Sequence, residues 1–304
     1  MGQSISCFHT KIHIGLRKRS IVIELKYEES KYIGFDGTRM FMAVYRPDDD
    51  RPRALMILLH GLGSHAGDFE NMGEFLAERG IAVFIPDLRG FGHYSGLKGH
   101  VMKFEEYIED IQNLVMQVKD RYLNKITYLF GSSMGGINAV QYIIKYPRTV
   151  DGLLLQCPGV SFKVDVGIGL LAGARFLSIL NVKRYFDLNP DYNETSRNPE
   201  TVKRHQLDPL RFERVTARFS TELLSASKDA FHSASRIMLP VLLQQAGEDN
   251  AVIPEKNNEF FENIASADKT WKLYDGLYHE LHEEPEREQI LGDLYSWLNK
   301  RLPS

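Results

Sequence analysis

A serine with a glycine two residues away on either side is the strongest chemical signal in this chain. The motif Gly131-Ser132-Ser133-Met134-Gly135 matches G-x-S-x-G with Ser133 in frame. A strand at 126–130 and a helix at 136–146 are predicted around it. A tight turn there would lift the Ser133 hydroxyl to a helix N-terminus, where free N–H groups favour developing negative charge. We therefore predict that Ser133 is a nucleophile.

A serine hydroxyl is a poor nucleophile unless a base takes its proton. With this turn motif, the acidic residue and then the histidine are expected further along the chain. Asp249 follows a predicted strand at 241–245, and His279 follows one at 271–274. Glu248 and His282 are the neighbouring alternatives. We predict Asp249 and His279, the latter because it comes first after its strand.

A second glycine-rich loop, His60-Gly61-Leu62-Gly63, follows a predicted buried strand at 54–59. Such a loop supplies an oxyanion donor in esterases, so we predict the N–H groups of Leu62 and Met134 as the oxyanion hole. The stretch from Gly61 to Ala66 also matches G-x-G-x-x-A, with Asp87 about twenty residues on. An NAD-binding oxidoreductase is thus an alternative, but it leaves Ser133 and its predicted partners unexplained.

Two further alternatives are weaker. His279-Glu280-Leu281-His282 resembles H-E-x-x-H, but its histidines are three residues apart instead of four, and no third ligand is evident. We expect neither a metal nor an organic cofactor. A non-catalytic binding protein of the same fold would be expected to lack a catalytic residue, whereas all three have candidates here.

The elements around these motifs alternate between strand and helix patterns from about residue 30. A hairpin is predicted around Asp36-Gly37, with strands at 32–35 and 41–45. The alternation indicates a mostly parallel central sheet with helices on both faces. Residues 158–225 interrupt it and are predicted to form an inserted cap, or lid. The predicted divisions are an N-terminal extension at 1–29, a core at 30–157 and 226–304, and the cap.

Composition bounds the remaining functions. The 304 residues carry a net charge of -3, which gives no reason to expect a nucleic-acid partner. The two cysteines, Cys7 and Cys157, predict no disulfide framework, and no apolar run is long enough to span a bilayer. We expect a cytoplasmic protein. The start of the chain fits N-myristoylation of Gly2, with Cys7 as a palmitoylation site, so this end is a hypothetical membrane tether.

The chain resembles the monoacylglycerol lipase and lysophospholipase family of the α/β-hydrolases over roughly residues 30–300. In that family the first histidine of a Y-H-x-L-H string is catalytic, which corresponds to His279. The serine and the acidic residue correspond to Ser133 and Asp249. The stretches that carry the resemblance are His60 to His65, Asp87 to Gly96, the motif at Ser133, Gly247 to Asp249, and Asp268 to Glu284.

The resemblance implies a serine esterase with an apolar cap over its site. We expect a lipid ester substrate, in the first place a monoacylglycerol, with a lysophospholipid or a general carboxylic ester as alternatives. An apolar cap could also contact a membrane surface. The residues predicted to contact substrate are Gly61, His65, Ile168, Leu171, Phe176, Leu177, Leu180 and Val252.

Overall fold

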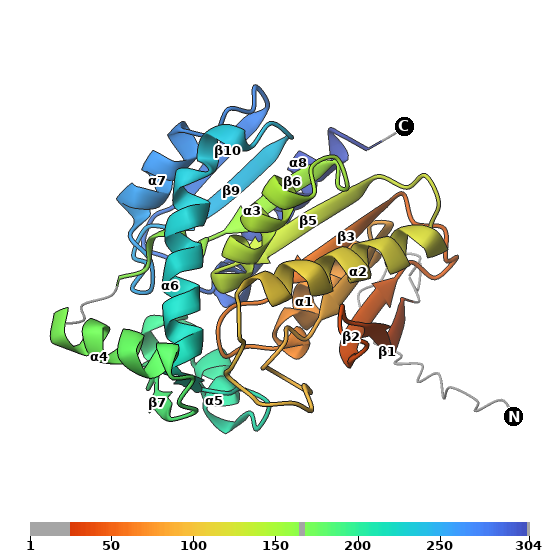
Figure 1. Ribbon diagram of the computed structural model, residues 1–304. Helices are drawn as coiled ribbons and strands as arrows, with labels where there is room; N and C mark the ends of the chain where they lie inside the picture. The colour runs from red at the N-terminus through yellow and green to blue at the C-terminus, as the bar shows by residue number, and fades with distance from the viewer. Residues whose placement is uncertain (1–24, 164–167, 303–304) are drawn as a thin grey trace, which may run out of the picture.

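Eight strands form one sheet in the order β1-β2-β4-β3-β5-β6-β9-β10 (Figure 1). This computed structural model describes residues 25–163 and 168–302, with the side chains of 168–172 left out. Strand β2 pairs antiparallel with β1 and β4, and the other pairings are parallel. The predicted mostly parallel sheet is thus confirmed. The strands are β1 Lys26–Ile33, β2 Arg39–Arg46, β3 Ala54–Leu59, β4 Ile81–Pro86, β5 Thr127–Ser132, β6 Gly152–Gln156, β9 Val241–Ala246 and β10 Lys269–Tyr274.

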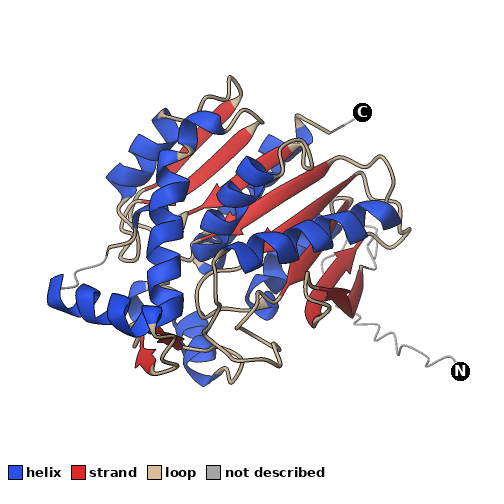
Figure 2. Cartoon of the chain, in the orientation of Figure 1, coloured by secondary structure: helices blue, strands red, loops and turns tan. Residues whose placement is uncertain are grey.

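Helices cover both faces of this sheet (Figure 2). Alternate residues of the fully buried β3 point to opposite faces, so Leu55 and Ile57 join one core cluster while Met56 and Leu58 join the other. The first cluster includes residues of α2, α3, α6 and α7, and the second includes residues of α1 and α8. The helices are α1 Glu70–Ala77, α2 Glu105–Arg121, α3 Met134–Lys145, α6 Ala217–His232, α7 Pro254–Glu262 and α8 Arg287–Asn299.

The chain between β6 and β9, residues 157–240, holds the elements that interrupt the alternation; we call it the β6–β9 segment. Figure 1 shows α4, β7 and α5 gathered at one end of the molecule, with α6 running from them along the sheet. The predicted cap, residues 158–225, ends inside α6 and so does not coincide with an element boundary. The remaining elements of the segment are η2 Gly159–Ser161, α4 Ile168–Ile179, β7 Tyr185–Asp187, η3 Tyr192–Glu194, α5 Pro199–Leu207, β8 Arg214–Thr216 and η4 Ala234–Arg236.

Some predicted bounds differ from the observed ones. The first strand of the hairpin begins at Lys26, not at Tyr32, and pairs with β2 along its whole length. Its early residues are charged and only partly buried, so they lack the apolar pattern of a strand. Within 25–163 and 168–302, no helix is both long and apolar enough to cross a membrane. The predicted lipidation sites Gly2 and Cys7 lie outside the described residues.

Candidate active site

Ser133 occupies the turn between β5 and α3, with a φ of 52° and a ψ of -119°. A positive φ is strained for any residue with a Cβ and persists only where the surroundings enforce it. The glycines of the motif allow this turn, because an added Cβ at Gly131 would lie 2.3 Å from the Gly135 carbonyl oxygen. At Gly135 it would lie 2.1 Å from the oxygen of Leu59. The predicted motif therefore has a steric basis.

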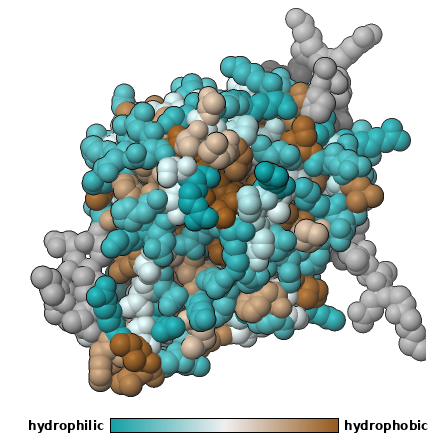
Figure 3. Space-filling model, turned by 45° about the horizontal axis from the view of Figure 1, so that its top comes forward, coloured by the Kyte–Doolittle hydropathy of each residue, from teal (hydrophilic) through white to brown (hydrophobic). Residues whose placement is uncertain are grey.

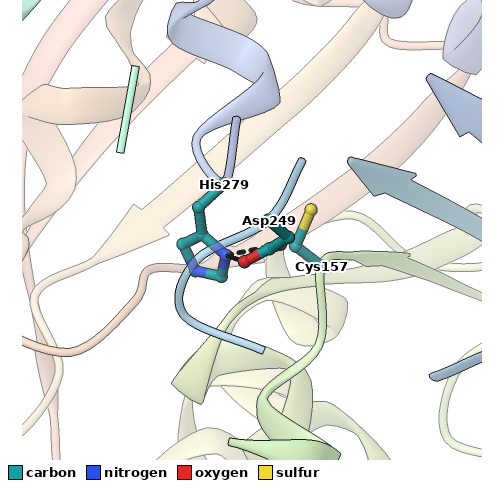
Figure 4. A group of neighbouring side chains, drawn as sticks. All are labelled: Cys157, Asp249 and His279. Atoms are coloured by element: carbon teal, nitrogen blue, oxygen red, sulfur yellow. Dashed lines mark hydrogen bonds and ion pairs between the residues drawn. The ribbon is translucent and has the colours of Figure 1, made fainter. Parts of the chain in front are cut away.

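Asp249 and His279 form a buried pair beyond the ends of β9 and β10 (Figure 4). The Nδ1 of His279 lies 2.9 Å from Oδ1 and 2.8 Å from Oδ2 of Asp249. The backbone N–H groups of Ala251 and Val252 donate to Asp249 Oδ1 at 2.9 and 3.0 Å. These donors favour an ionised carboxylate, so Nδ1 carries the proton and the Nε2 lone pair is free to act as a base.

The charge of each partner changes the pKa of the other. Burial alone would raise the pKa of Asp249, but the interactions with His279 and the two N–H donors hold it below its ordinary value. Burial would likewise lower the pKa of His279, but the charge and hydrogen bond of Asp249, with the charge of Glu280, raise it. A histidine with a raised pKa accepts a proton more readily.

The two alternatives to this pair have other contacts. His282 is buried with its Nδ1 2.7 Å from Gln156 Oε1, and its ring stacks on Phe69. Glu248 is exposed, whereas Asp249 is buried. Among the described residues, no hydrogen bond joins the Ser133 hydroxyl to His279. Catalytic hydrogen bonds often tighten only when substrate binds.

The loop with the predicted oxyanion donor Leu62 lies directly against Ser133. A Cβ added at Gly61 would come 3.2 Å from Ser133 Cβ, so glycine permits this approach. His60, which sequence reasoning assigned no role beyond the motif, anchors the loop: its Nε2 accepts from the N–H of Leu88 at 2.8 Å. Burial lowers the pKa of His60 to about 4, which keeps this nitrogen unprotonated. The other predicted donor, Met134, is the first residue of α3.

The NAD-binding alternative requires the Asp87 carboxylate to bind a ribose, but this carboxylate instead accepts hydrogen bonds from the protein backbone. It is buried, its Oδ1 accepts from the N–H of Ala66 at 2.8 Å, and its Oδ2 accepts from the N–H of His93 at 2.7 Å. Both carboxylate oxygens therefore support the loops beside the site. This arrangement disfavours the dinucleotide interpretation of Gly61 to Ala66.

The predicted substrate contacts remain predictions. The ring of His65 is held by Asp208 through a 2.8 Å contact, and Val252 is buried in a small cluster with Cys157. Phe176 of α4 and Leu180 directly after the helix are 63% and 57% exposed, and Leu177 is half-buried. The side chains of Ile168 and Leu171 lie outside the described residues.

Cys157, which the sequence analysis assigned no role in the site, lies beside the pair of Asp249 and His279. The ligating atoms of Cys157, Asp249 and His279 lie within 4.8 Å of one another (Figure 4). A metal would need the thiolate, but burial and the charge of Asp249 raise the pKa of this thiol well above its ordinary range. His65, Asp68 and Asp208 form a second such group, but Arg211 lies 2.9 Å from Asp68 and would repel a cation. Neither group suits a metal ion.

Comparison with known proteins gives consistent matches over most of the chain. Residues 50–286 match the family described as "Serine aminopeptidase, S33". A monoacylglycerol lipase of Mycolicibacterium smegmatis is 29% identical over 275 residues, which are 90% of this chain and 98% of that protein. The phospholipase YtpA of Bacillus subtilis is 29% identical, covering 79% of this chain and 93% of its own.

Solved structures agree with these relatives. The monoacylglycerol lipase of Paleococcus ferrophilus superimposes with a TM-score of 0.78 and 28% identity, over 86% of this chain and 98% of its own. A monoglyceride lipase from Saccharomyces cerevisiae, in complex with a substrate analogue, has a TM-score of 0.81 over 96% of this chain and all of its own. At 19% identity it supports the fold alone. These matches confirm the predicted α/β-hydrolase fold and the predicted resemblance.

Proposed function

Because the chain belongs to the family described as serine aminopeptidase, S33, we propose that it is a serine hydrolase that cleaves lipid-like carboxylic esters, most directly monoacylglycerols. The names of its relatives support the predicted class of enzyme, a carboxylic ester hydrolase. The proposal rests on the hydrogen-bonded pair of Asp249 and His279, together with a serine held at positive φ in the turn between β5 and α3. A serine at such a turn and a histidine oriented by a buried carboxylate are the parts of acyl transfer.

In the proposed mechanism, the Ser133 hydroxyl attacks the ester carbonyl carbon while His279 Nε2 accepts its proton. Asp249 holds the imidazole in the required tautomer and stabilises its charged form. The N–H groups of Leu62 and Met134 donate to the oxyanion as it develops. His279 then returns the proton to the leaving alcohol, and water hydrolyses the acyl-enzyme by the same steps. Each such oxyanion donor contributes about 3 kcal/mol of transition-state stabilisation.

A hydrophobic acyl chain is supported by the surface of the β6–β9 segment. Figure 3 shows hydrophobic residues gathered at the corner of the molecule where α4 lies, with further hydrophobic patches elsewhere on a largely hydrophilic face. Phe176 and Ile179 of α4, and Leu180 directly after it, are 63%, 77% and 57% exposed. An exposed apolar patch surrounded by hydrophilic surface is typical of a site that contacts an apolar ligand or a membrane. We therefore extend the proposal to contact between α4 and the lipid that presents the substrate.

A lysophospholipid is the second candidate substrate, because one relative is named as a phospholipase. The family description also names an aminopeptidase, so an amide belongs among the compounds tested. Purified protein should be assayed with monoacylglycerols of increasing chain length, a lysophospholipid, an acetyl ester and an aminoacyl anilide. We expect turnover to rise with acyl length and to vanish in Ser133→Ala. A steady fall in turnover from acetyl to dodecanoyl, or faster cleavage of the anilide, would refute the lipid assignment.

A further inference from the structure

One buried arginine of the β6–β9 segment contacts side chains from two regions of the predicted site, one after Leu62 and one after His279. Arg211 lies between α5 and β8, and its side chain is only 5% exposed. Its Nη2 is 2.9 Å from Asp68 Oδ2 and 3.2 Å from Glu280 Oε1. Asp68 lies in the short 3-10 helix η1 Ala66–Phe69, which directly follows the Leu62 loop, and Glu280 is the residue after His279. A single guanidinium therefore connects the proposed oxyanion loop with the proposed base loop.

Near the predicted oxyanion donor, the contact of Arg211 with Asp68 is one of several that join the β6–β9 segment to the Leu62 loop. Asp68 Oδ2 also accepts from the Ser64 hydroxyl at 2.6 Å, within the loop itself. The residue after Arg211 adds a backbone bond, in which the Phe212 N–H donates to the carbonyl of Gly63 at 3.0 Å. Gly63 is the residue after Leu62, and Ser64 is two residues after it. Both contacts therefore restrain the backbone close to the predicted donor.

On the base side, Glu280 is held by three parts of the β6–β9 segment. Its backbone N–H donates to the carbonyl of Thr195 at 2.9 Å, and its Oε2 lies 3.2 Å from Nδ1 of His205. Arg211 completes the set. Since Glu280 follows His279 directly, these contacts fix the backbone from which the imidazole projects.

We propose that Arg211 is a positioning residue that holds the Leu62 loop and the His279 loop in register through Asp68 and Glu280. The inference rests on the proposed function and deepens it, because it gives the β6–β9 segment a role in assembling the catalytic geometry besides contacting lipid. Two carboxylates from different loops would repel each other without the cation between them. A planar guanidinium with several donors suits this bridging position better than an ammonium group.

The charges around Glu280 also couple this bridge to the proposed base. Burial would raise the pKa of Glu280, but Arg211, His205 and His282 hold it well below its ordinary range, so it is ionised. Arg211 contacts Asp68 and His205 in addition, and its charge lies over the ring of Tyr192. His279 itself is faced by Asp249, Glu280 and the neutral thiol of Cys157. The charge of Glu280 is thus one cause of the raised pKa of His279.

The test compares full-length variants on a soluble ester, with kcat, KM, melting temperature and the pH dependence of kcat/KM measured for each. Arg211→Met and Glu280→Ala break the bridge, and we expect kcat to fall about tenfold or more with a smaller change in KM. Glu280→Gln keeps an acceptor for Arg211 but removes the charge. We expect it to recover most of kcat and to move the acid limb of the profile down by roughly half a pH unit.

The matched control is Arg197→Met. Arg197 also joins the β6–β9 segment to the chain after His279, through a 2.6 Å contact with Glu284, but it touches neither Asp68 nor Glu280. We expect this variant to leave the acid limb in place. If Arg211→Met does not fold, the role of Arg211 is tested with Arg211→Lys and Glu280→Gln, by the same comparison of kcat and acid limb with the control.

Two outcomes would overturn the proposal: bridge variants that lose only thermal stability, as Arg197→Met does, or an acid limb that stays in place in Glu280→Gln. Ser133→Ala is assayed in parallel. If it is inactive while the bridge variants behave like the control, only the role of Arg211 fails. If it retains activity, the proposed function fails as well.

Discussion

The imidazole of His282 lies flat on the ring of Phe69, with ring centroids 4.1 Å apart and an interplanar angle of 13°. Its Nδ1 is engaged by Gln156, and burial lowers its pKa. This histidine, three residues from His279, therefore has packing partners in place of a carboxylate. The difference separates two histidines that are hard to distinguish by sequence.

Replacing each histidine with alanine should affect a different property, catalysis for His279 and stability for His282. We expect His279→Ala to reduce kcat by about 10⁴-fold or more, because the hydroxyl loses its base. His282→Ala should retain measurable turnover but lose about 1–3 kcal/mol of stability, since it leaves a cavity beside Phe69. Steady-state kinetics and urea unfolding check both. An inactive, fully folded His282→Ala protein would show that the base has been misassigned.

The pH dependence of activity should report the pair of His279 and Asp249. The imidazole must be neutral to accept a proton, so kcat/KM falls as pH drops through its pKa. Since the Asp249 and Glu280 charges raise that pKa above the ordinary 6.5, the acid limb should lie above pH 6.5. Asp249→Asn removes the main stabilising charge. We expect its acid limb to move to lower pH and its kcat to drop by about 10⁴-fold.

A profile of kcat/KM between about pH 5 and pH 9 tests this prediction. Glu248→Gln is the matched control, because Glu248 is the exposed neighbour of Asp249 and its removal should leave the limb in place. An unchanged limb in Asp249→Asn would contradict the assigned pair.

The strained turn at Ser133 makes a prediction about stability. A non-glycine residue at a φ of 52° and a ψ of -119° costs about 1–3 kcal/mol. Glycine tolerates this conformation, although its greater freedom in the unfolded chain offsets part of the gain. We expect Ser133→Gly to unfold at higher urea than Ser133→Ala, with a difference of about 1 kcal/mol, and both to be inactive. A less stable glycine variant would argue against strain at this turn.

Much of this candidate site could be predicted from the sequence, because its residues follow the ends of strands. Ser133 follows the buried β5 directly, and Asp249 and His279 lie in the loops after β9 and β10. Parallel strands deliver such residues to one edge of a sheet. The steric need for Gly131 and Gly135 is likewise local. These features could be read without knowing the tertiary structure.

The contacts of Arg211 with Asp68 and Glu280 could not be predicted from the sequence in the same way. Asp68 and Arg211 are far apart in the chain, and the polar stretch that contains Arg211 has no periodic pattern that would place it. The partners of His282 are also far from it in the chain, since Gln156 comes from β6 and Phe69 from the 3-10 helix before α1. Contacts of this kind depend on how the β6–β9 segment folds back, which composition and spacing do not specify.

The exposed side of α4 should matter only when the substrate is presented by a lipid surface. Ile179 is 77% exposed, and burying an isoleucine side chain in a bilayer interface contributes about 1.5–3 kcal/mol. We expect Ile179→Ser to weaken binding to monoacylglycerol-containing vesicles about tenfold or more, and to lower hydrolysis there by a similar factor. Activity on a water-soluble short ester should change much less.

Leu207→Ser provides the control, because Leu207 is 72% exposed at the end of α5 and outside the α4 surface. Equal losses on vesicles for both variants, or equal losses on both substrates for Ile179→Ser, would contradict a role of α4 in lipid contact.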